Sequence, residues 1–174
     1  MKFVSDIRLL LIGLWLGAAC FFIGVAQTAF TVLPSAELAG AVVNRSLSVL
    51  NLSGLAIAII LFALTFITTR TTNIFLLWSE RVLLLLVAIA CGISQFVVGW
   101  WLMSVRTQMG RPIDQIPPDD PLRAQFNNLH EYSVWLLIAA MTAGLLAFFI
   151  ISNRKFGAGK AKAPEIDLQN QFKF

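Results

Sequence analysis

Four long runs of hydrophobic residues dominate the chain, and none of them contains a charged residue. They cover residues 9–30, 46–69, 82–105 and 132–153. Each run exceeds the roughly 20 residues that an α-helix needs to cross a bilayer core of about 30 Å. Within lipid, every backbone amide needs a partner inside its own segment, and the strict alternation of a barrel strand is absent. The pattern therefore predicts four transmembrane helices.

The predicted architecture is an all-α integral membrane protein, an antiparallel bundle of four transmembrane helices. The helices are expected at about residues 6–32, 39–69, 73–105 and 127–152, within one transmembrane domain, 1–153. Ser35 is expected to cap the second helix. The prolines of "IPPDDP" keep the third connection out of helix. The last segment, 154–174, is predicted to be a polar tail.

Composition supports lipid as the natural solvent of the chain. Of the 174 residues, 58% are hydrophobic and only 13% are charged, and the mean hydropathy is +0.80. A soluble domain carries about twice that share of charge. The first apolar run continues beyond Cys20 through Phe21 and Phe22, and a signal peptide has a core of only about 7 to 15 residues. We therefore interpret the first run as a membrane helix.

The distribution of Lys and Arg predicts the orientation. Nine lie on the side of the two termini and four on the other side. The nine are Lys2, Arg8, Arg70, Arg81, Arg154, Lys155, Lys160, Lys162 and Lys173, and the four are Arg45, Arg106, Arg111 and Arg123. The positive-inside rule then places both termini in the cytoplasm, in a bacterial inner membrane. The pI near 9.5 follows from this topology and requires no nucleic acid.

Small residues mark one face of the first helix as a helix-packing stripe. Gly13, Gly17, Cys20 and Gly24 recur at i, i+4, i+7 and i+11. Such a stripe lets a second helix approach closely. The partner helix is either within this bundle or on another subunit.

Polar residues gather at the periplasmic ends of the predicted helices, while the cytoplasmic halves are expected to carry few polar residues beyond Thr65 and those at the helix boundaries. The candidate set is Gln27, Asn44, Arg45, Asn51, Gln95, His130 and Ser133. Because a polar side chain facing lipid without a partner costs several kcal/mol, we expect these groups to point toward one another. The pattern predicts a polar pocket that binds a ligand. The alternative is that the same groups only join the helices to one another.

His130 and the two cysteines are the candidate ligands for a cofactor. His130, the only histidine, is a possible haem or pigment ligand, a proton carrier or an interfacial residue. Cys20 and Cys91 are expected at similar depth and are weak candidates for a soft metal. No metal and no cofactor is otherwise predicted. No catalytic triad, HExxH, phosphate loop or CxxC is present, so the chain is predicted not to be an enzyme.

Two stretches of the chain resemble a known family. They are "LWLGAACFFIGVAQTAFTVLP", residues 14–34, and "FNNLHEYSVWL", residues 126–136. They are similar to the first and fourth helices of the transmembrane protein 205-like membrane family, a group of unknown function. The second stretch fills that family's F-x-x-L-H-x-x-S signature. Gln27 stands where the family pattern has proline. The resemblance implies a four-helix membrane fold without an established reaction.

Three functions remain open at this point. The first is a non-catalytic accessory or assembly subunit of a larger membrane complex, with other membrane subunits, further copies of the chain and membrane lipids as partners. The second is a transporter-like or ligand-binding protein that uses the polar pocket. The third is pigment or haem ligation through His130.

Overall fold

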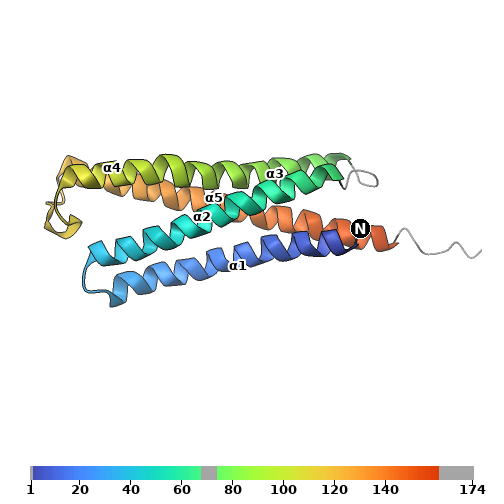
Figure 1. Ribbon diagram of the computed structural model, residues 1–174, viewed down its shortest axis with the longest axis horizontal. Helices are drawn as coiled ribbons and strands as arrows, with labels where there is room; N and C mark the ends of the chain where they lie inside the picture. Colours follow the sequence, from blue (N-terminus) through green and yellow to red (C-terminus); the bar gives the residue numbers. More distant parts are fainter. Residues whose placement is uncertain (1, 68–73, 161–174) are drawn as a thin grey trace, which may run out of the picture.

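The computed structural model describes residues 2–67 and 74–160, which form helices and the short connections between them (Figure 1). The helices are α1 (Lys2–Val32), α2 (Ala36–Ile67), α3 (Ile74–Gly92), the π-helix η2 (Ile93–Val98), α4 (Gly99–Met109), the 3-10 helix η3 (Ile113–Gln115) and α5 (Pro121–Lys160). No strand occurs among the described residues. The predicted inner connection at 70–72 and residues 161–174 of the predicted tail lie outside them.

Four helices in the described part are long and apolar enough to span a membrane, because α3, η2 and α4 join into one rod from Ile74 to Met109. Large hydrophobic side chains face outward on all of them. Phe21 is 75% exposed, Trp100 is 68% exposed and Phe149 is 55% exposed. Exposed apolar surface on this scale is expected where the surroundings are lipid. The fold indicates a multi-pass membrane protein.

Capping residues explain why some helix ends differ from the predicted ones. The Leu38 N–H donates to Ser35 Oγ at 3.3 Å, which is the cap expected for α2. α5 begins at Pro121, earlier than predicted, because the Leu122 N–H donates to Asp120 Oδ1 at 2.8 Å. Proline suits the first helical position, since its missing N–H would have no partner there. At its other end, α5 continues to Lys160, into the segment predicted as tail.

The neighbours of α1 differ between the two ends of the bundle, since it packs against α5 toward its start and against α2 toward its end. We use "outer half" for the half that contains the α1–α2 connection and "inner half" for the half in which α1 begins. In Figure 1, α1 and α5 approach each other near the N-terminus and separate toward the outer end. The core divides accordingly. Ala29, Ala39 and Val43 pack between α1 and α2, while Val105 and Leu129 belong to a separate cluster between α4 and α5.

Candidate functional site

The polar face of α2 lies against the rod formed by α3, η2 and α4. Asn51 Nδ2 donates to Ser94 Oγ at 2.9 Å, and both side chains are buried. Gln95 Nε2 donates to Ser48 Oγ, also at 2.9 Å. Buried polar groups without a partner would cost several kcal/mol, so these bonds satisfy groups that could not face lipid alone.

Two consecutive residues that both bond with α2, Ser94 and Gln95, lie in the π-helix η2. Successive side chains on an α-helix point about 100° apart. In η2 the turn is wider, with the Gly99 N–H donating to the Ser94 carbonyl, so successive side chains diverge less. Single π-turns of this kind often occur at functional sites.

The contact between α2 and the rod extends toward both ends. Near the outer end, Arg106 forms an ion pair with Glu37, and each side chain is a little over one-third exposed. Near the inner end, Arg81 Nε donates to Thr65 Oγ1 at 3.0 Å. We call the set Glu37–Arg106, Ser48–Gln95, Asn51–Ser94 and Thr65–Arg81 the polar seam. The polar seam joins α2 to the rod of α3, η2 and α4 along most of the length of α2.

The structure does not bring the seven predicted pocket residues together. Asn51 and Ser133 are buried and Gln95 is half-buried, but Gln27, Asn44, Arg45 and His130 are exposed. Ser133 Oγ donates to the His130 carbonyl at 2.6 Å, a bond within its own helix. The reason is the divergence of α1 and α2 from α4 and α5 in the outer half, which separates the faces that the sequence pattern placed opposite one another.

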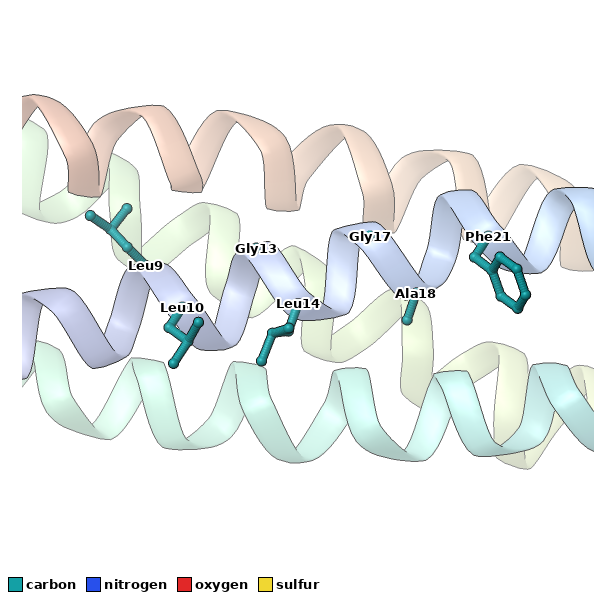
Figure 2. Close-up of a pocket in the computed structure, with 7 residues that line it drawn as sticks. All are labelled: Leu9, Leu10, Gly13, Leu14, Gly17, Ala18 and Phe21. Carbon is teal, nitrogen blue, oxygen red and sulfur yellow. The ribbon is translucent and has the colours of Figure 1, made fainter.

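The glycine stripe of α1 is largely uncovered. A Cβ at Gly13 would lie 3.6 Å from the Phe148 ring, an ordinary contact with α5. At Gly17 and Gly24 a Cβ would meet nothing within 4 Å, and Cys20 is exposed. The missing side chains leave a shallow groove along α1, shown in Figure 2. Its lining residues are Leu9, Leu10, Gly13, Leu14, Gly17, Ala18 and Phe21.

Close helix packing occurs around Trp15 instead of along the glycine stripe, and the sequence pattern did not predict a role for Trp15. The indole is 3% exposed and lies against Gly54 of α2 and Gly144 of α5. A Cβ at Gly54 would lie 2.5 Å from Trp15 Nε1, and one at Gly144 would lie 3.1 Å from the ring. Trp15 Nε1 donates to the Leu50 carbonyl at 3.1 Å. A large residue on one helix facing glycines on two others was the signal available in the sequence.

The inner half contains a buried ion pair that the sequence pattern did not predict. Arg8 of α1 and Glu80 of α3 form an ion pair there, with side chains 3% and 0% exposed. Arg8 and Glu80 lie just before the charge-free runs 9–30 and 82–105, so the sequence pattern indicates the edge of the membrane at these two positions. Each nevertheless lies six residues after the start of its helix, and both helices begin in the inner half. Opposite charges at equal depth were the signal that could have identified the pair.

The metal candidates do not form a cluster. Cys20 and Cys91 are free thiols, the first exposed and the second buried. Within the described residues, no group of three His, Cys, Asp or Glu side chains could hold a metal ion.

Comparison with known families establishes where the chain belongs. The model of a domain of unknown function, DUF4149, matches residues 10–111. The chain belongs to the DUF4149 family. The DUF4149 match includes most of α1 and all of α2, α3, η2 and α4, and therefore the polar seam and the contact of Trp15 with Gly54, but not that with Gly144. The stretch around His130 lies beyond the match. No curated protein and no solved structure matches the chain.

Proposed function

We propose that this DUF4149 protein is a non-catalytic accessory subunit that binds another membrane protein through the uncovered face of α1. The observation that supports the proposal is the open space around Gly17 and Gly24. A bacterial inner membrane with both termini in the cytoplasm, and kinship with the transmembrane protein 205-like family, are further parts of the proposal.

The energetics of helix association in lipid favour an intermolecular role for this face. Lipid tails are as apolar as leucine, so helices associate through close van der Waals contact, for which small residues are suited. A glycine inside a helix costs about 1 kcal/mol relative to alanine. Gly54 and Gly144 offset that cost by admitting the Trp15 ring. Gly17 and Gly24 have no such contact within the described chain, so a partner helix would supply it.

Substitution of Gly17 tests the proposal without disturbing the fold. The tagged protein is purified in mild detergent, and its mass and co-purifying proteins are determined. We expect wild type to elute with a partner or with further copies, and Gly17→Leu to elute as the 19.2 kDa chain alone. The matched control is Ala56→Leu, which enlarges an exposed residue of α2 and should leave the association intact. Wild type that elutes alone, or a Gly17→Leu variant that keeps its partner, would contradict the proposal.

Haem or pigment ligation through His130 stays a prediction. The side chain is exposed near the outer end of α5, within reach of a ligand shared with another subunit. A visible absorption spectrum of the purified protein, compared with that of His130→Ala, tests it directly. Ligand binding in the outer polar pocket has less support, because four of its seven predicted residues are exposed rather than gathered around a cavity.

A further inference from the structure

A second groove runs between α1 and α2 in the outer half, and Arg45 lies on its wall. The groove measures about 350 Å³ and is mostly apolar. Phe21, Phe22 and Val25 of α1 line one side, and Val49 and Leu50 of α2 line the other. The sequence pattern predicts an internal pocket for Arg45, but the structure places it on this outward-facing surface, on the side of α2 that faces α1.

Arg45 lies at a depth where a charge needs a partner. It follows Ala36, the first residue of α2, by nine residues, or about 14 Å along the axis. A helix of 32 residues is about 48 Å long, so it extends about 9 Å beyond each side of a hydrocarbon core of about 30 Å when centred in it. The Arg45 backbone would then lie about 5 Å inside the core, from where an arginine side chain reaches the headgroups.

No residue in the described part of the chain supplies that partner. The Arg45 side chain forms neither a hydrogen bond nor an ion pair with any residue in the described part of the chain. The carboxylate nearest in α2, Glu37, is paired with Arg106 in the polar seam. A guanidinium left unpaired at the edge of lipid is costly, and its planar donor array matches a phosphate.

We propose that this groove binds a glycerophospholipid from the adjacent leaflet, with the lipid phosphate on Arg45 and an acyl chain along the apolar walls. Arg45 lies toward the outer end of the groove, and most of the residues deeper in it are apolar. The hydroxyl of Ser53, which also lines the deeper part, donates to the Leu50 carbonyl of its own helix at 3.0 Å. The groove adjoins the protein-binding face of α1, with which it shares Ala18 and Phe21, but the proposal rests on Arg45 and goes beyond that face.

Lipid titration of the whole protein tests the site. The delipidated chain in detergent is titrated with phosphatidylglycerol, and bound lipid is counted by native mass spectrometry. Arg45→Gln should weaken the tightest binding about fivefold, the effect of one cation near a lipid headgroup. Arg111→Gln, which removes an exposed arginine from the connection after α4, is the matched control and should leave that binding unchanged.

A second variant tests the acyl chain separately from the charge. Val49→Trp fills the groove while keeping Arg45, and Val49 is 62% exposed, so the larger side chain can be accommodated without disturbing the core. We expect weaker lipid binding in this variant also, and no binding of glycerol phosphate, which has the headgroup charge but no chain. Together these results support the site.

The lipid site would be overturned if Arg45→Gln and Arg111→Gln weakened lipid binding equally, or if Val49→Trp left lipid binding unchanged. Binding of glycerol phosphate as tight as that of the lipid would also overturn it. So would the loss of a co-purifying protein from Arg45→Gln while its lipid binding stayed unchanged. The last result would assign Arg45 to an acidic partner protein. None of them affects the test at Gly17, so the two proposals can fail separately.

Discussion

Replacement of Gly54 by alanine should destabilise the bundle far more than the size of a methyl group suggests. The new Cβ would lie 2.5 Å from Trp15 Nε1, 2.7 Å from Cε2 and 2.9 Å from Cζ2. Optimal contacts between heavy atoms are about 3.5 to 4.0 Å. The indole cannot easily move away, because it is buried, donates to the Leu50 carbonyl and is bounded on the other side by Gly144.

The magnitude follows from two contributions. Overpacking of a well-packed core costs about 1 to 3 kcal/mol. Displacement of the indole also lengthens its hydrogen bond to Leu50, worth about 0.5 to 1.5 kcal/mol. We therefore expect Gly54→Ala to lower the free energy of unfolding by about 1.5 to 4.5 kcal/mol, the sum of the two ranges. In the double variant with Trp15→Phe, the smaller ring relieves the overlap, so the combined loss should be less than the sum of the single losses.

The assay is reversible unfolding in mixed micelles with increasing dodecyl sulfate, followed by circular dichroism. Gly24→Ala is the matched control, because it makes the same chemical change in α1 where a Cβ meets nothing within 4 Å. It should raise stability by up to about 1 kcal/mol, because alanine suits a helix interior better than glycine. The packing argument is refuted if Gly54→Ala and Gly24→Ala have the same stability, or if Trp15→Phe does not reduce the effect of Gly54→Ala.

Three further outcomes are expected in the same assay. Asn51→Leu removes the hydrogen bond to Ser94, so a double-mutant cycle with Ser94→Ala should give a coupling of about 0.6 to 1.7 kcal/mol, and zero coupling would contradict a direct bond. Glu80→Ala leaves the Arg8 charge buried without its carboxylate and should cost about 3 to 5 kcal/mol, whereas removal of both charges should cost less than the sum of the single changes. Gly110, with φ of +60°, ends α4 in the left-handed region of backbone conformation. Gly110→Ala should therefore lower stability by about 1 to 2 kcal/mol. An unchanged unfolding transition would mean that the backbone at this position adapts freely.

Much of the fold follows from local patterns in the sequence. The four apolar runs predict the four long helices, because backbone amides in lipid must be satisfied within their own segment. The cap at Ser35 also follows from neighbouring residues alone. Spacing predicts which residues share a face, and Ser48 and Asn51 do face the same neighbouring helix. The early start of α5 at Pro121 was missed because its cap, Asp120, lies in a proline-rich stretch.

The neighbour of each helix face was decided by the tertiary structure alone. Periodicity places Gly13, Gly17 and Gly24 on one side of α1 but gives no angle between α1 and α5, and their divergence is what leaves Gly17 and Gly24 open. The same divergence separates Gln27 from His130.

The buried pair Arg8–Glu80 and the Trp15 site also depend on positions that are distant along the chain. Arg8 and Glu80 meet at the inner end although α1 and α3 are not adjacent helices, and Trp15 is enclosed because two glycines on different helices reach the same level. Helix formation in lipid is a local matter of backbone hydrogen bonds, whereas helix packing depends on shape complementarity between whole surfaces, which a linear pattern does not specify.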